Sequence, residues 1–230
     1  MPHGRICKRQ NAGGAHKTHA DTHDVKQRPT HTANHPNNSV LFVGTGDGLA
    51  IYRAAKRGEW RRVGHALAGA AVRAIVAADA LTLLVAADGR PPQQSFDGGA
   101  TWSDAAGSPP EPIGVQVATL HGPMPVAYAR LSGASAYARL GGQPPALLGA
   151  GADGSFLFRS EDDGIHWQAA RIDSSASGRV TTIVPAADRR DAAWAGTASG
   201  TLLRTDNRGR SWQLVAREPA AILSLAAALE

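Results

Sequence analysis

The chain has 230 residues, with 24 Lys and Arg against 19 Asp and Glu, nine His, one Cys and five Trp. This length allows one substantial hydrophobic core and is too short for three ordinary domains. A single cysteine excludes an intramolecular disulfide framework and a cysteine-cluster zinc site. The longest uncharged apolar run, from Ala220 to Leu229, covers about half of a membrane span, so we expect no transmembrane helix.

The first 39 residues differ from the rest of the chain in charge and hydropathy. They hold six basic and two acidic side chains, a net charge of +4, so the remaining residues carry only +1 of the formal +5. Their only large apolar residues are Ile6 and Val25, too few to bury a core. We therefore expect a disordered basic tail over residues 1–39 and a folded domain over residues 40–230. The tail lacks the apolar stretch of a secretory signal, which favours cytoplasmic residence.

Six of the nine histidines lie in this tail. His16, His19 and His23 would share one face of a helix, and imidazole is a common ligand of Zn²⁺, Ni²⁺ and Cu²⁺. The surrounding threonines and the disordered context disfavour that helix, so we expect an incidental His-rich tail with these three as candidate ligands. No cofactor is expected. Any nucleic-acid binding should also reside in the tail and should weaken steeply with salt.

A repeated motif of the pattern S-x-D-x-G-x-x-W runs through the folded domain. Two copies are intact, a third has Asn in the Asp position, and a decayed copy keeps little besides its tryptophan. The motif residues are Ser95, Asp97, Gly99 and Trp102; Ser160, Asp162, Gly164 and Trp167; Thr205, Asn207, Gly209 and Trp212; and Trp60 of the decayed copy. This motif is the Asp-box, and the chain resembles the BNR/Asp-box repeat proteins, which are β-propellers. Sialidases, sortilin-type receptors and photosystem assembly factors are relatives in that broad sense.

We interpret the boxes as structural. The hydroxyl and the carboxylate can accept hydrogen bonds from backbone amides of a turn, as in Asx and ST turns. The glycine takes a conformation that other residues resist, and the tryptophan buries a large ring. Together these residues would fix a hairpin between the outer strands of a blade. The resemblance implies that the boxes lie away from the active-site face.

Each box follows a pair of β-pattern segments joined by a Gly-rich turn. Apolar segments at 72–76, 115–120 and 180–184 precede three of these pairs and would line a central channel. The first pair, which begins at Val40, has no such segment before it. We therefore predict that residues 220–229 complete the first blade beside Val40–Val43 and close the ring. The alternative is an exposed C-terminal strand that forms a dimer; a monomer is favoured.

The spacing of the box tryptophans predicts the number of blades. Trp60, Trp102, Trp167 and Trp212 are 42, 65 and 45 residues apart. This spacing predicts an all-β propeller of four blades, with five as the alternative because the longest step holds extra residues. The extra residues include a tandem duplication, 127–131 and 136–140, which predicts a hairpin. That hairpin is either an insertion or the core of a shrunken fifth blade.

Catalytic groups are sparse in this sequence. Sialidase-like hydrolysis needs an arginine clamp, a tyrosine nucleophile with a glutamate partner, and an acid. Arg73 and Arg179 lie in or beside channel segments, but two arginines do not make a clamp. The sequence has five Glu and three Tyr, of which Tyr128 and Tyr137 fall in the duplication.

We therefore predict a non-catalytic module for protein interaction or assembly, whose partner is a protein. A glycan-binding protein or sialidase-like glycoside hydrolase is one alternative, and nucleic-acid or metal binding through the tail is another. This functional step rests on fold analogy. The candidate contact residues lie at matching positions of the duplication: Tyr128, Arg130, Tyr137 and Arg139.

Overall fold

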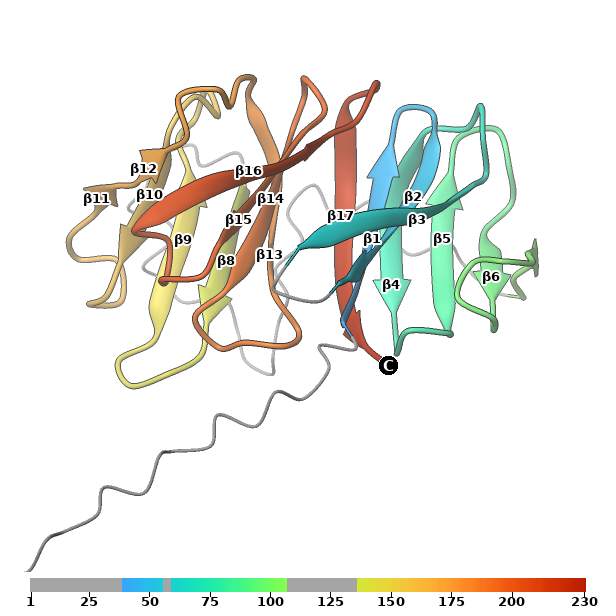
Figure 1. The fold of residues 1–230 in the computed structure, drawn as a ribbon, viewed down its shortest axis with the longest axis horizontal. Coiled ribbons are helices and arrows are strands. Elements are labelled where there is room, and N and C mark those ends of the chain that lie inside the picture. The colour runs from blue at the N-terminus through green and yellow to red at the C-terminus, as the bar shows by residue number, and fades with distance from the viewer. Residues whose placement is uncertain (1–38, 56–58, 107–135) are drawn as a thin grey trace, which may run out of the picture. The chain divides into compact units, whose positions relative to one another are not determined.

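The computed structural model describes residues 39–55, 59–106 and 136–230. Every regular element in these ranges is a β-strand, and the strands form four sheets (Figure 1). The described residues all belong to one compact unit, which spans Asn34–Glu230. They include no helix that is long and apolar enough to cross a membrane. The tail histidines His16, His19 and His23 lie outside the described residues.

The first sheet combines both ends of the described chain in the order β17-β1-β2-β3. β17 pairs antiparallel with β1, from Ser39 opposite Leu229 to Thr45 opposite Ile222. The predicted pairing of the C-terminal segment with Val40–Val43 is therefore present within one chain, and the alternative of an exposed C-terminal strand is wrong. The strands of this sheet are β1 (Ser39–Thr45), β2 (Gly48–Ala54), β3 (Trp60–Ala66) and β17 (Ile222–Leu229).

The other three sheets are consecutive in the chain, and each begins as an antiparallel meander. The second sheet holds β4 (Val72–Ala77), β5 (Leu83–Ala87), β6 (Gln93–Ser95) and β7 (Ser103–Asp104). The third holds β8 (Ala136–Leu140), β9 (Ala146–Ala150), β10 (Leu157–Ser160) and β11 (Gln168–Ala169). The fourth holds β13 (Val180–Pro185), β14 (Ala193–Thr197), β15 (Thr201–Thr205) and β16 (Ser211–Arg217), with β12 (Arg171–Ile172) added parallel to β16.

The third sheet corrects one prediction. Residues 136–140, the second copy of the duplication, were expected in an inserted hairpin or a shrunken blade. They form β8, which pairs with β9 as the first strand of the third sheet. Ala136, Ala138 and Leu140 are buried because the alternation of the strand turns them toward the core. The segment 115–120, expected in this position, and the first copy at 127–131 lie outside the described residues.

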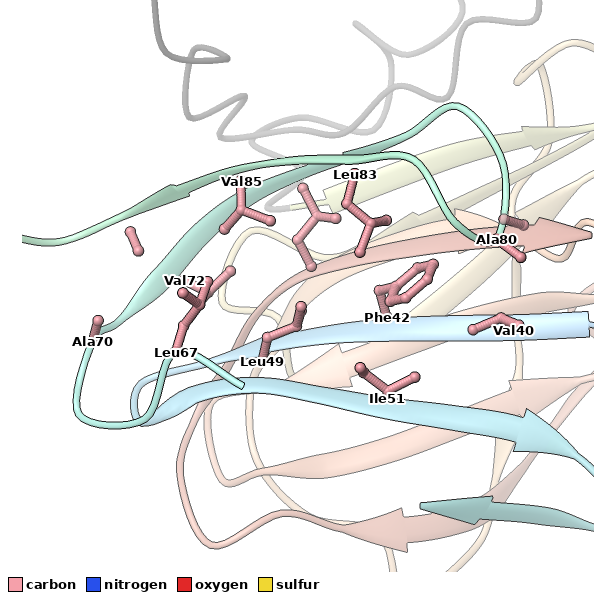
Figure 2. Packing of buried hydrophobic residues seen from close by; sticks show 13 residues of the cluster. Val40, Phe42, Leu49, Ile51, Leu67, Ala70, Val72, Ala80, Leu83 and Val85 are labelled. Atoms are coloured by element: carbon pink, nitrogen blue, oxygen red, sulfur yellow. The ribbon is translucent and has the colours of Figure 1, made fainter. Parts of the chain in front are cut away.

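Three hydrophobic clusters lie between neighbouring sheets. The first joins the first and second sheets, where Phe42 and Leu49 pack against Val72, Leu83 and Val85 (Figure 2). The second cluster joins the third and fourth sheets, and the third cluster joins the first and fourth. Contacts of β17 with β4 and β13, and of β13 with β8, follow the same order. The described sheets therefore succeed one another as second, first, fourth and third.

Candidate functional site

The box at residues 95–102 forms a closed set of hydrogen bonds inside one hairpin. The Ser95 hydroxyl donates to Asp97 Oδ1 at 2.8 Å and accepts the Gly99 amide at 2.9 Å. Asp97 also accepts the Ala100 and Thr101 amides at 3.0 and 2.9 Å and the Thr101 hydroxyl at 2.6 Å. Gly99 has a φ of 92°, in the left-handed region that favours glycine. These bonds hold the carboxylate in its charged form, and the pKa of Asp97 falls to about 2.

The other two boxes repeat this geometry with different side chains. Asp162 accepts the amide of His166 at 2.9 Å, and its other oxygen lies 2.6 Å from Nδ1 of that histidine. Asn207 accepts the amide of Ser211 at 2.9 Å and donates to its hydroxyl at 2.8 Å. The preceding hydroxyls, Ser160 and Thr205, accept the glycine amides at 2.8 and 3.0 Å. The polar groups of the boxes are thus used within the turns themselves.

The box tryptophans lie at different depths. Trp102 is partly buried beside the first cluster and donates its indole N–H to the Gly99 carbonyl at 3.0 Å. Trp167 is also partly buried, whereas Trp212 is 2% exposed in the second cluster. Trp60 begins β3, and residues 56–58 of its decayed box are outside the described ranges. Asp162 is exposed, whereas Gly164 and Gly209 are buried beneath their turns.

Of the four predicted contact residues, two are described by the structure. Tyr137 is half-buried and Arg139 is exposed on β8, while Tyr128 and Arg130 are not among the described residues. The two channel arginines also differ from each other. Arg73 binds Asp88 with both Nε and Nη2, at 2.7 and 2.6 Å, and this ion pair lowers the pKa of Asp88. Both side chains of this pair are about half exposed, so the pair lies at the surface.

Arg179 lines a pocket of about 240 Å³ between the third and fourth sheets. Val180 and Leu203, both buried, give the pocket an apolar floor, and Thr197 adds a hydroxyl group. That hydroxyl accepts the Thr201 amide at 2.9 Å and lies 3.0 Å from the Ser199 hydroxyl. The pocket is therefore small, and its Thr197 hydroxyl is already hydrogen-bonded within the fold.

In the structure, Tyr52 contacts Glu218, although the two residues are 166 positions apart in the sequence. The Tyr52 hydroxyl donates to Glu218 Oε1, and Arg62 Nη1 lies 3.2 Å from Glu218 Oε2. Tyr52 is 4% exposed and Glu218 is 5% exposed. Burial, followed by the bond to Glu218, raises the pKa of Tyr52 far above its usual range. The hydrogen bond and the ion pair join β2 and β3 to the segment before β17 in the interior of the fold.

The larger depression is the seam groove, about 380 Å³, between the outer strands β3 and β16 of the first and fourth sheets. Its Trp60 packs edge-on against Trp194, with ring centroids 4.5 Å apart. Its lining residues are Glu59, Trp60, Arg61, Arg204, Asp206, Gln213, Leu214 and Val215.

Arg204 contacts two aromatic rings and two carboxylates. Its guanidinium carbon lies 4.7 Å from the Trp194 ring and 5.3 Å from the Trp60 ring, within the range of cation–π attraction. Nη2 lies 2.9 Å from Asp206 and 3.3 Å from Asp188, and the side chain is 8% exposed. Among the described residues, Nη1 has no hydrogen-bond partner. A buried donor without a partner is costly unless water or a ligand satisfies it.

No local pattern in the sequence indicates this groove. Arg204 lies directly opposite Trp194 in the β14–β15 ladder, whereas Trp60 comes from another sheet. All five residues of β15 are buried, so no alternation marks Arg204 as special. The available signal was a charged residue directly after two leucines in a short strand. No group of three or more His, Cys, Asp or Glu able to hold a metal occurs among the described residues.

Comparisons with known proteins assign no family. No protein-family model matches the chain, and no curated protein matches it. Solved structures give loose matches. The GH74 enzyme of Niastella koreensis has 16% identity and a TM-score of 0.31, covering 80% of this chain and 25% of that one. The α-L-arabinanase of Penicillium chrysogenum in complex with arabinobiose has 12% identity and a TM-score of 0.29, covering 81% and 58%.

A third match is YCF48 bound to a D1 peptide, with 12% identity and a TM-score of 0.24, covering 78% of this chain and 82% of that one. This chain spans a quarter of the length of the GH74 enzyme and somewhat more than half of the arabinanase. At these scores the likenesses give this chain neither an activity nor a ligand.

Proposed function

We propose that the chain is a four-bladed Asp-box propeller whose C-terminal strand β17 closes the first blade. The repeated hydrogen bonds of the three boxes support this, as does the pairing of β17 with β1. The succession of contacts between inner strands supports it as well. In this arrangement the boxes are structural, and they leave the seams between blades as candidate binding surfaces.

The chain acts as a non-catalytic module that binds a protein partner through the seam groove. The observation that carries this proposal is Arg204, a cation whose side chain is 8% exposed, lies against two indole rings and lines the groove. The rings and the ion pairs with Asp188 and Asp206 fix its position before any partner arrives. A preorganised site loses little side-chain entropy on binding, which is the property that a recognition surface needs.

The composition of the groove also supports a protein partner. Trp and Arg are enriched at the centres of protein interfaces, where a large ring buries area and a guanidinium donates several hydrogen bonds. Trp60 supplies the ring, and Gln213 and Asp206 supply polar groups around it. The groove can therefore combine apolar burial with directional hydrogen bonds.

Affinity capture from native lysate, with mass spectrometry at two salt concentrations, tests the proposal. The full chain is compared with a variant in which the six basic residues of the tail are replaced by Gln. We expect both proteins to retain the same few partners at the higher salt concentration, because the groove is unchanged. Capture by the unaltered chain alone, removed by salt, would instead assign binding to tail electrostatics and contradict the proposal. Release of the bound proteins by simple sugars would favour the glycan-binding alternative.

A further inference from the structure

The outer edges of the four sheets are not equivalent. β7 and β11, the last strands of the second and third sheets, have two residues each. β3 and β16 have seven residues each, and Figure 1 shows both in front of the inner strands. The beginning of β16 is covered, because β12 pairs with Ser211 and Trp212. Among the described residues, no strand pairs with the outer edge of β3.

An uncovered edge strand presents a row of N–H and C=O groups that a further strand can bind. β12 demonstrates such addition in this fold, because a connecting segment joins the outer edge of the neighbouring sheet. The corresponding edge of the first sheet has no such cover from the described part of the chain. β3 is therefore a place where an extended segment from elsewhere can pair.

Two features of β3 limit the pairing of another strand with its outer edge. The bulge between Ile51 and Tyr52 interrupts the register of β3 before Gly64, and this limits straight pairing to a short segment near Trp60. Arg61 and Arg62 add charge, but each is held by an acid, Glu59 at 3.2 Å and Glu218 at 3.2 Å. The register shift and the charged side chains disfavour pairing with a long, flat strand. They still allow pairing with a short one.

The seam groove begins at this same short segment. Glu59, Trp60 and Arg61 form one wall, and Leu214 and Val215 contribute apolar surface from the other. A strand paired with the beginning of β3 would place alternate side chains toward the groove. The guanidinium of Arg204 lies behind this surface, where it is 8% exposed and contacts the Trp60 ring.

We propose that β3 and the seam groove together bind an extended polypeptide segment of the partner, added as a short outer strand of the first sheet. The segment pairs through its backbone with the beginning of β3 and packs an apolar side chain on Trp60. The inference rests on the proposed function and specifies its mode of recognition. Backbone pairing favours a polypeptide over a glycan, because only a peptide carries the alternating donors and acceptors of a strand.

Selection of short random linear peptides on phage, with the full chain as bait, tests this mode directly. A selected peptide is synthesised, and each of its backbone nitrogens is methylated in turn. We expect methylation at every second residue to weaken binding about tenfold or more, and the intervening positions to tolerate it, because only one edge of the peptide pairs with β3.

Three variants of the chain locate the peptide. Trp60→Ser should weaken binding about tenfold, and so should Gln213→Arg, which fills the groove from an exposed position without touching the core. Phe96→Ser, at an aromatic side chain that is 67% exposed in the turn after β6, is the matched control and should leave binding unchanged. Thermal unfolding of each variant verifies that it is folded.

Several results would overturn the strand-addition proposal: no enriched peptide, methylation effects without a period of two, or equal binding by Gln213→Arg. A glycan that binds the unaltered chain and is lost in Gln213→Arg would also overturn it, by assigning the groove to carbohydrate. The lysate capture is independent of these results, because a folded partner can occupy the groove without adding a strand. Failure of this mode is therefore distinguishable from failure of the proposed function.

Discussion

Tyr52 and Glu218 are 166 residues apart in sequence and share a buried hydrogen bond. Tyr52 belongs to β2, and Glu218 lies in the link between β16 and β17. The bond, together with Arg62, fastens the first sheet to the segment that delivers the C-terminal strand. The Glu218 amide adds a bond to the Gly200 carbonyl at 2.8 Å, which ties this link to the fourth sheet.

Replacement of Tyr52 by Phe removes the donor and leaves a buried carboxylate with one partner fewer. We expect Tyr52→Phe to lower the free energy of unfolding by about 1–3 kcal/mol, measured by urea denaturation at neutral pH. Glu218→Gln and the double variant complete a mutant cycle. The two effects should be strongly non-additive, and simple additivity would contradict a direct interaction between these side chains.

Acid should destabilise the fold through the Asp-boxes. In the folded chain, bonds from the Thr101 hydroxyl and amide and from Ser95 lower the pKa of Asp97 to about 2, below its ordinary value of 3.8. Bonds led by the His166 amide lower the pKa of Asp162 as well. A depressed folded-state pKa contributes stability above the unfolded-state pKa, and this contribution is lost as the pH falls through the folded-state value.

We therefore expect the urea midpoint to fall between about pH 4 and pH 2, and to fall less in Asp97→Asn than in the unaltered chain. Asn207 already fills this position in another box and accepts the Ser211 amide, so asparagine should preserve the turn. Equal acid dependence in the two proteins would contradict the role given to the Asp97 carboxylate.

Gly44 marks a close approach between the first and second sheets. A methyl group at this position would lie 2.6 Å from the Val72 carbonyl oxygen and would also collide with the Ser224 hydroxyl. Because the obstacle at Val72 is backbone, relief requires movement of β1 or β4. We expect Gly44→Ala to cost about 1–3 kcal/mol of unfolding free energy in chemical denaturation. Gly69→Ala is a control for added bulk, since nothing lies within 4 Å of its methyl position; its φ of 76° adds a local backbone cost.

β17 should carry much of the stability of the first sheet. Leu225 is fully buried in the cluster between the first and fourth sheets, whereas Leu229 is 51% exposed at the end of the strand. We expect Leu225→Ala to cost about 2–5 kcal/mol and Leu229→Ala less than about 0.5 kcal/mol in the same denaturation assay. Similar small effects at both positions would mean that β17 is not docked against β1 in solution.

The sequence predicted those features that depend on local pattern or on completing a repeat. Ser95, Asp97 and Gly99 lie within five residues of one another, so their turn is encoded locally. The pairing of β17 with β1 was predictable because the first repeat lacks a strand and the last segment supplies one.

The missed features depend on contacts between distant segments. The identity of β8 was missed because the extra residues of the long step concealed which segment begins the third sheet. Tyr52 with Glu218, and Trp60 with Arg204, each join different sheets. No periodicity within one strand marks such pairs, because their residues become neighbours only after the sheets pack.

The central claim is that the seam groove is the binding surface. Its most direct test is quantitative capture from native lysate by three full-length proteins: the unaltered chain, Gln213→Arg and Phe96→Ser. Gln213 lines the groove at an exposed position, and Phe96 is an exposed residue in the turn after β6. We predict that Gln213→Arg loses the partners retained by the unaltered chain and that Phe96→Ser keeps them. Retention of the same partners by Gln213→Arg would contradict the claim.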